Sequence, residues 1–165
     1  MMLGASAKSH ARSLRVGLAL IGVAGAALAI DASTKSAAGA SLDPGERSQI
    51  LPGLAMVHAE NSGAAFGLLA GGGTWLLPAI SALAIVAGIV ILSRRRLLVS
   101  IPGALAMGGA VGNLVDRFGD SRVTDWLELP NWPPFNLADV SIVVGIALVA
   151  MQLLGRTGTR ETQFD

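Results

Sequence analysis

The chain of 165 residues contains no cysteine. Disulfide bonds, thiolate metal sites and cysteine nucleophiles are therefore excluded, and the chain has no cysteine of its own to carry a lipid. Histidine is nearly as scarce, because only His10 and His58 are present. An HExxH motif or another histidine cluster that binds a metal is therefore absent from the sequence. We expect a function that needs neither a metal nor another cofactor.

Charged residues are also few. They make up 14% of the chain, whereas soluble domains usually carry about a quarter. Hydrophobic residues reach 52%, and the mean hydropathy is +0.61. This composition predicts a membrane protein, and the length predicts a single domain. No basic stripe with interleaved aromatic residues is present, so a nucleic-acid partner is not expected.

Four apolar runs predict an α-helical membrane protein with four transmembrane helices. Each run is close to the 17 to 25 residues, roughly, that cross a bilayer as a helix, and residues 74–92 form a run of 19 residues without a charge. The expected spans are about 14–30, 74–92, 97–115 and 138–154, within one membrane-embedded domain of residues 1–165, and the larger loops are 31–73 and 116–137.

The first run allows two interpretations. It follows a basic segment and ends in Ala27-Leu28-Ala29, which is typical of a cleavable signal peptide. The polar sequence from Asp31 to Lys35, directly after it, favours a retained helix with a functional end. With either interpretation, the chain just beyond residue 31 lies outside the cytoplasm.

The first large loop contains signals of a small β-structure. Turn sequences occur at Asp43-Pro44-Gly45 and at Pro52-Gly53. The apolar pairs and runs beside them, Ile50-Leu51 and residues 54–57, are predicted to form strands. This loop is therefore predicted to form a small sheet outside the membrane.

The distribution of basic residues predicts that both termini are cytoplasmic. Lysine and arginine accumulate in the cytoplasmic loops of membrane proteins. Eight of the 12 lie in the two tails and in the loop between the second and third spans: Lys8, Arg12, Arg15, Arg94, Arg95, Arg96, Arg156 and Arg160. Acidic residues and all three tryptophans gather on the opposite, outer side: the tryptophans are Trp75, Trp126 and Trp132.

Carboxylates cluster in residues 108–139, although apolar runs bound this stretch on both sides. Asp125 follows a segment that is expected to be extended, and Asp139 begins the fourth span. The intervening loop is rich in proline and asparagine, so it can fold back and bring both carboxyls to one site. Two close carboxyls in an apolar setting do not both ionise readily, so one keeps a proton while the other acts as a base. This predicts an aspartic-protease dyad at the outer membrane surface, with the protonation order left open.

Other roles compete for these acids. Asp139 can also cap the fourth helix, because carboxylates favour helix N-termini. Asp120 and Glu128 are interpreted as ordinary solvated charges. Asn113 and Arg117 share a helical face next to Asp116, at a helix end where polar groups face protein or a water-filled cleft.

Two further pairs lie on the helices. Gly108 and Gly112 are interpreted as a surface for close helix packing. Asp31 and Lys35 are spaced i,i+4, which is typical of a local ion pair and equally compatible with a part in the site.

Two alternatives to an aspartic enzyme arise. A serine–lysine hydrolase would use Lys35 with Ser33 or Ser62, although no motif marks either serine as a nucleophile. A non-enzymatic transporter or assembly factor would use its acids to line a polar path. Transporters place binding groups near the bilayer midplane, whereas the middle of every predicted span is uncharged. His58 is interpreted as a polar strand residue.

Taken together, the polar motifs resemble those of lipoprotein signal peptidase, or signal peptidase II. Five blocks occur in the order and approximate spacing of that family, and with the four spans they cover most of residues 14–155. They are Asp31-x-x-Thr34-Lys35, Asn61-Ser-Gly-Ala-Ala-Phe66, Gly108-Gly-Ala-x-Gly-Asn113-x-x-Asp116-Arg117, Val123-x-Asp125 and Phe135-Asn136-x-Ala138-Asp139.

The resemblance implies a bacterial inner-membrane aspartic endopeptidase with four membrane helices and a small extracytoplasmic strand cradle. Such an enzyme cuts prolipoproteins before a diacylglyceryl-modified cysteine, as a monomer among membrane lipids, and is inhibited by globomycin-type antibiotics. Asp125 and Asp139 match the catalytic aspartates of the family. Matching positions imply substrate-binding or dyad-supporting roles for Asp31, Lys35, Asn61, Asn113, Asp116, Arg117 and Asn136. Departures are small: Ser121 stands where the family often has glycine, and Trp126 where phenylalanine is frequent.

Overall fold

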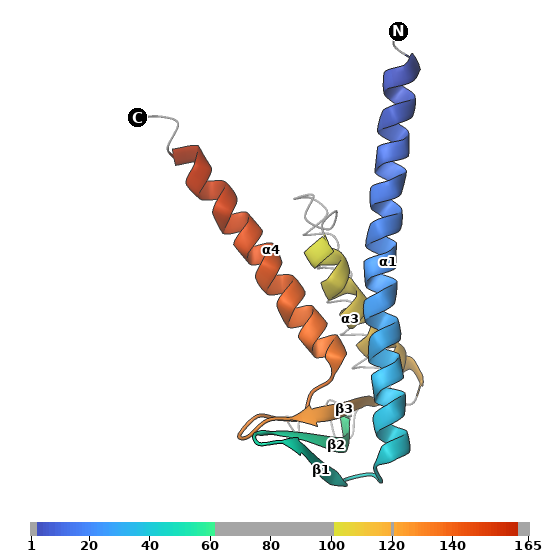
Figure 1. Cartoon of the computed structure of the whole chain (residues 1–165), viewed down its shortest axis with the longest axis vertical. Helices are drawn as coiled ribbons and strands as arrows, with labels where there is room; N and C mark the ends of the chain where they lie inside the picture. Colours follow the sequence, from blue (N-terminus) through green and yellow to red (C-terminus); the bar gives the residue numbers. More distant parts are fainter. Residues whose placement is uncertain (1–2, 62–100, 120, 162–165) are drawn as a thin grey trace.

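Long helices and a small antiparallel sheet meet at one end of the molecule (Figure 1). The structure is a computed structural model that describes residues 3–61, 101–119 and 121–161, with side chains for 10–61, 101–119 and 121–155. The helices are α1 (Leu3–Ser41), α3 (Ile101–Gly119) and α4 (Leu137–Glu161). The strands are β1 (Arg47–Leu51), β2 (Leu54–Asn61) and β3 (Val123–Glu128).

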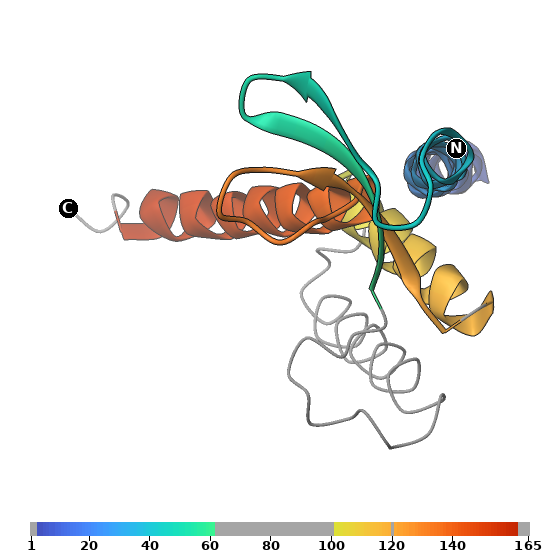
Figure 2. The same cartoon turned by 90° about the horizontal axis from the view of Figure 1, so that it is seen from below.

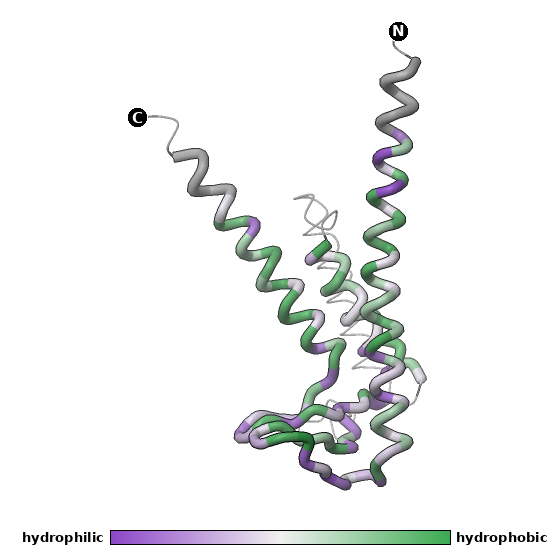
Figure 3. Tube along the Cα trace, in the orientation of Figure 1, coloured by the Kyte–Doolittle hydropathy of each residue, from purple (hydrophilic) through white to green (hydrophobic). Residues whose placement is uncertain are grey.

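Two of the described helices are long and apolar enough to cross a membrane. They are His10–Ser41 within α1 and Leu137–Gly155 within α4, with hydropathies of 2.0 and 2.2. Large apolar side chains such as Ile21 and Ile146 are more than half exposed. Exposure of this extent suits a lipid environment rather than water. Figure 3 shows the apolar colouring along the helices and the polar colouring where they meet the sheet.

The first helix is longer than the sequence predicts. α1 continues to Ser41, although the outer loop was expected to begin at residue 31. The extension is rich in alanine and lacks proline, Asp31 pairs with Lys35 at i,i+4, and Ala38 is 1% exposed. Local pairing and burial therefore continue the helix after the apolar run ends.

The third and fourth helices overlap the predicted spans, although both run beyond the predicted ends. α3 continues to Gly119, past the predicted residue 115, and α4 continues to Glu161, past the predicted residue 154. α4 begins at Leu137, next to the predicted start. The second predicted span, residues 74–92, and the beginning of the third lie outside the described residues, as do Ser62 and Asp120.

The strands predicted near residues 50–57 are confirmed. The sheet has the order β1-β2-β3 with antiparallel neighbours. Gly45 and Gly53 adopt φ angles of 82° and 84°, which suit the turns predicted on either side of β1. Figure 2 shows the strands crossing in front of the region where α3 and α4 meet.

Glycines bring the helices into close contact, as the sequence predicts for Gly108 and Gly112. A Cβ atom at Gly108 would overlap the backbone oxygen of Ala24 on α1. One at Gly109 would overlap the backbone oxygen of Ala138 on α4. Neighbouring glycines on α3 therefore contact two different helices.

His58 joins the sheet to the end of α1. It lies on β2, and its Nδ1 is 2.9 Å from the backbone oxygen of Leu42. Because a carbonyl only accepts, Nδ1 donates the proton in this bond. His58 is therefore a strand residue, as expected, with a structural hydrogen bond.

Candidate active site

Polar side chains are buried where the C-terminal part of α1, the C-terminal part of α3 and the start of α4 meet the sheet. Side chains of this kind are seldom buried unless they have partners. Five polar or charged residues are nevertheless less than 9% exposed there: Asp31, Lys35, Asn113, Asp125 and Asn136. All five belong to the set that the sequence singles out.

Asp125 is held on β3 by two amide donors. Ala59 lies opposite Asp125 in the sheet register, so Asn61 is a diagonal neighbour on the same face. Asn61 Nδ2 donates to Asp125 Oδ2 at 2.9 Å, and Asn136 Nδ2 donates to Asp125 Oδ1 at 2.7 Å.

Asp139 lies in the first turn of α4 and forms a reciprocal cap with Asn136. The backbone N–H of Asp139 donates to Asn136 Oδ1 at 3.0 Å, and the backbone N–H of Asn136 donates to Asp139 Oδ2 at 3.3 Å. This is the geometry of a capping box. In addition, Asn113 Nδ2 donates to Asp139 Oδ1 at 2.7 Å. Asp139 is thus both a cap and part of the polar cluster.

The loop between the two aspartates folds back, as predicted. Phe135 exchanges backbone hydrogen bonds with Leu127 on β3, of 2.8 and 2.9 Å. This pairing places Asn136, which is fully buried, beside Asp125. One residue, Asn136, therefore hydrogen-bonds to both carboxylates.

Lys35 contacts three other polar side chains of this cluster. Its Nζ is 2.6 Å from Asp31 Oδ2 and 2.6 Å from Asp116 Oδ2, and it donates to Asn113 Oδ1 at 3.1 Å. Asp31 also accepts the backbone N–H of Ala138 through Oδ1 at 2.8 Å. The Asp31–Lys35 pair is therefore more than a local ion pair, because it connects α1 to α3 and to the start of α4.

Two other charged side chains have partners of their own. Arg117 donates to the backbone oxygen of Asn113 at 3.1 Å. Glu128 forms an ion pair with Arg47, whose side chain is 55% exposed. Such exposed pairs contribute little to stability.

Burial changes the acidity of Asp125. Its side chain is 3% exposed, and loss of solvation is the largest influence on it. The hydrogen bond from Asn61 opposes this influence, and the negative charge of Asp139 adds to it. The net result raises the pKa of Asp125 from 3.8 to about 6.

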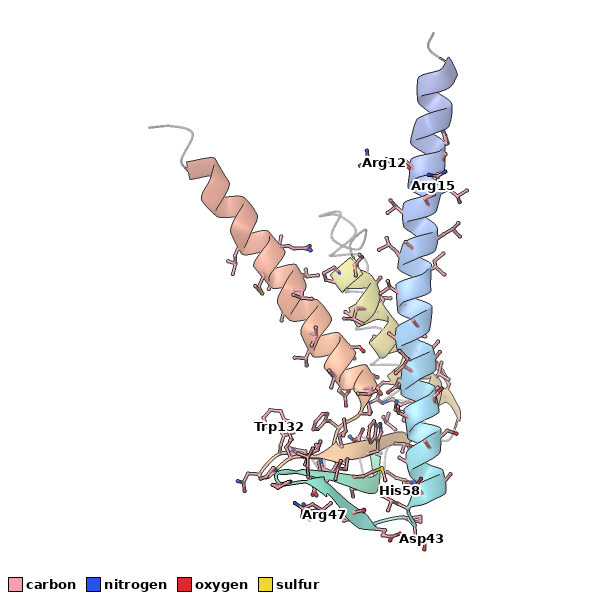
Figure 4. The ribbon with its side chains drawn as sticks, in the orientation of Figure 1. Arg12, Arg15, Asp43, Arg47, His58 and Trp132 are labelled. Carbon is pink, nitrogen blue, oxygen red and sulfur yellow. The ribbon has the colours of Figure 1, made fainter. Side chains whose placement is uncertain are left out.

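An apolar groove opens beside Asp139. It has a volume of about 360 Å³ and is lined by Trp132, Phe135, Asp139, Val140, Val143 and Val144. Trp132 is on the loop before α4 (Figure 4). The sequence alone does not single out these valines, because apolar residues fill most of α4 and its periodicity does not mark one face. Their i,i+3,i+4 spacing from Val140 is the only signal that could have found them.

The comparisons with known proteins agree with these motifs. The family model described as Signal peptidase (SPase) II matches residues 23–155. The chain belongs to the signal peptidase II family.

Relatives of this signal peptidase II family member match over most of their length. A lipoprotein signal peptidase of Serratia marcescens is 36% identical over 89% of this chain and 92% of that protein. One of Mycobacterium leprae (strain Br4923) is 40% identical over 88% of this chain and 79% of that protein. The chain is also similar to two solved bacterial membrane enzymes, with TM-scores of 0.72 and 0.68 at 25% and 26% identity. They cover 82% and 86% of this chain, and the chain covers 92% and 90% of them.

Membership of the signal peptidase II family, together with the apolar helices, makes this a membrane-embedded protease. The transporter or assembly factor considered from sequence is not supported.

Proposed function

We propose that this protein removes signal peptides from diacylglyceryl-modified prolipoproteins, cutting before the lipidated cysteine, with Asp125 and Asp139 as the catalytic dyad. The observation that carries the proposal is that Asn136 hydrogen-bonds to both carboxylates. Their arrangement at the ends of helices suits a substrate whose lipid is anchored in the bilayer and which must be cut at its surface.

The chemistry requires one protonated and one ionised carboxyl. The ionised carboxylate takes a proton from water as the water oxygen attacks the scissile carbonyl carbon. The protonated carboxyl donates to the carbonyl oxygen. Proton transfer to the amide nitrogen then accompanies cleavage of the C–N bond and releases the signal peptide with a new carboxyl end. No metal or other cofactor enters these steps.

The serine–lysine alternative has less support. Lys35 lies 2.6 Å from each of two carboxylates and donates to Asn113 Oδ1 at 3.1 Å, so its Nζ is directed at these groups rather than at Ser33. Ser33 donates its hydroxyl to the backbone oxygen of Ala29 at 2.6 Å, along its own helix. Ser62 lies outside the described residues.

The apolar groove beside Asp139 suits the part of the substrate that lies in the bilayer. Its valines follow α4 away from the sheet, so an apolar chain that enters from the membrane reaches Asp139 without crossing a charged surface. Binding energy from such a remote segment can position the scissile bond.

The proposed setting is the bacterial inner membrane, with a monomer of four spans, both termini in the cytoplasm and the active site at the outer face. Arg12 and Arg15 lie towards the N-terminal end of α1, far from the sheet (Figure 4). This separation supports a cytoplasmic N-terminus, because basic residues favour that side.

The function is tested by incubating the purified protein with a prolipoprotein that carries the diacylglyceryl group and with the same prolipoprotein without it. We expect cleavage of the lipidated form only, immediately before the modified cysteine, and inhibition by globomycin. Mass spectrometry of the products identifies the bond. Cleavage elsewhere, or equal cleavage of both forms, would contradict the proposal.

A further inference from the structure

The hydrogen bonds around Asn113 fix the orientation of its amide. Asn113 Oδ1 accepts from Lys35 Nζ at 3.1 Å and from Asn136 Nδ2 at 3.2 Å. An ammonium group has only donors, so turning the amide over would set N–H groups against N–H groups. Asn113 must therefore present Nδ2, a donor, to Asp139, and the bond to Oδ1 is 2.7 Å.

The surroundings of Asp139 favour a negative charge. It receives the Asn113 donor, whose amide is polarised by the ammonium of Lys35, and a backbone N–H from Asn136. It also lies in the first turn of α4, where the helix dipole stabilises anions. Its side chain lines the groove, from which a water molecule can reach it.

The surroundings of Asp125 differ on each of these points. It lies on a strand rather than at a helix N-terminus, and it is 3% exposed. Its two side-chain donors are the neutral amides of Asn61 and Asn136. Burial and the charge of Asp139 both raise the pKa of Asp125, and together they outweigh the two amide hydrogen bonds and the charge of Lys35, which lower it. A second negative charge is therefore disfavoured there.

The remaining charges near the dyad balance one another. Among the described residues, Lys35 pairs with Asp31 and Asp116, and Arg117 donates to the backbone oxygen of Asn113. The formal charges of these four side chains sum to zero, so they add no net charge to that of the dyad. Which of the two carboxyls carries the negative charge then depends on which one receives the oriented donors.

Resting on the function proposed above, we propose that Lys35 is a positioning residue which, through Asn113, keeps the negative charge of the dyad on Asp139. Asp139 then acts as the general base towards water from the groove. Asp125 holds the proton and acts as the general acid towards the scissile carbonyl. Lys35 itself does not touch the reacting atoms.

The assignment is tested by NMR on the full-length protein in detergent micelles, with ¹³C at the aspartate carboxyl carbons. The chain has only seven aspartates, and Asp125→Asn and Asp139→Asn identify two of their signals. In the unsubstituted protein, the signal that is absent from Asp125→Asn should titrate with a midpoint of about 6. The reverse assignment would overturn the proposal.

The role of Lys35 is tested by three substitutions in the same measurement. Lys35→Met should raise the midpoint of Asp125, because a cation that lowers the pKa of this carboxyl is lost. Lys35→Arg retains the charge and should restore the original pattern. Arg47→Met removes an exposed outer cation and should change neither signal.

An unchanged Asp125 midpoint in Lys35→Met would overturn the positioning role. If that variant does not fold, Asn113→Leu removes the oriented amide and leaves the cation. The midpoint of Asp125 should then fall, because the negative charge that raises its pKa is no longer held on the neighbouring carboxyl. Neither measurement needs a substrate. Failure of the cleavage assay and failure of this assignment are therefore separate results.

Discussion

At the scale of single residues, burial of Asp125 makes the stability of the protein depend on pH. Its pKa is about 6 in the folded state and 3.8 as the reference value for an unfolded chain. The folded state therefore binds more protons between these values, and stability decreases as pH rises through this window. The contribution is present below about pH 4 and is lost above about pH 6. The full difference is on the order of 3 kcal/mol.

Thermal unfolding in detergent from pH 4 to pH 8 measures this effect. The unsubstituted protein should lose stability relative to Asp125→Asn as pH rises, because asparagine does not ionise. The quantity to compare is the slope of unfolding stability against pH. The absolute stabilities differ in addition, because the substitution also changes one hydrogen bond. Parallel curves for the two proteins would show that Asp125 ionises normally.

Ser121 has a backbone conformation that favours glycine. Its φ angle is 65°, in the left-handed region where an L-residue with a side chain is disfavoured by roughly 1–2 kcal/mol. The resemblance to signal peptidase II places glycine at this position in many members. Ser121→Gly should therefore stabilise the protein by about 0.5–1 kcal/mol, after allowance for the greater freedom of glycine in the unfolded chain.

The matched control is Ser48→Gly on strand β1, where the backbone is extended and glycine should be destabilising. Unfolding midpoints of both variants decide the prediction. A loss of stability at both positions would show that the strain at Ser121 is not significant.

At the scale of helices and strands, contact between α3 and α4 depends on Gly109. A Cβ there would overlap the backbone oxygen of Ala138, the residue before Asp139. Gly109→Ala should therefore destabilise the protein by about 1–3 kcal/mol. It should also slow cleavage at least tenfold, because the first turn of α4 is displaced from the dyad geometry.

The control for this substitution is Gly25→Ala on α1, where an added Cβ has no atom of the described residues within 4 Å. It should leave activity unchanged and stability equal or slightly higher, since alanine favours helix. Equal effects of the two substitutions on unfolding and cleavage would contradict the packing argument.

The elements also show which features can be predicted from sequence. The strands were predictable because turn residues bound short apolar segments, and the start of α4 because polar residues precede an apolar run. The extension of α1 to Ser41 was not predictable from hydropathy, because buried alanines and the Lys35 contacts stabilise it. The double role of Asn136 depends on the fold-back of Phe135 against Leu127, and sequence spacing does not contain that pairing.

At the scale of the whole molecule, the proposed topology separates the two ends of α1 by the membrane. The chain has no cysteine, so single cysteines can be introduced as probes. Ser48→Cys, on exposed strand β1, should react with a membrane-impermeant thiol reagent added outside intact cells. Ser13→Cys, near the start of α1, should react only after the membrane is opened. Labelling in the opposite order would refute the orientation.

Motifs from the whole chain were enough to identify the family, because five blocks recur in order across distant segments. The same motifs did not reveal which side chains of the site hydrogen-bond to one another. Lys35, Asn113 and Asn136 come from three different helix ends, and their hydrogen bonds depend on how α1, α3 and α4 pack. Packing of this kind follows from glycine contacts and buried amides rather than from local pattern.

The central claim is that Asp125 and Asp139 perform the cleavage, and single substitutions test it most directly. Initial rates on a diacylglyceryl-modified prolipoprotein should be measured for Asp125→Asn, Asp139→Asn and the control Asp43→Asn, whose carboxyl lies at the exposed turn before β1 (Figure 4). We predict that each dyad variant folds, inserts and loses cleavage by at least about 10³-fold, while the control keeps the full rate. Full activity in either Asp125→Asn or Asp139→Asn would contradict the account.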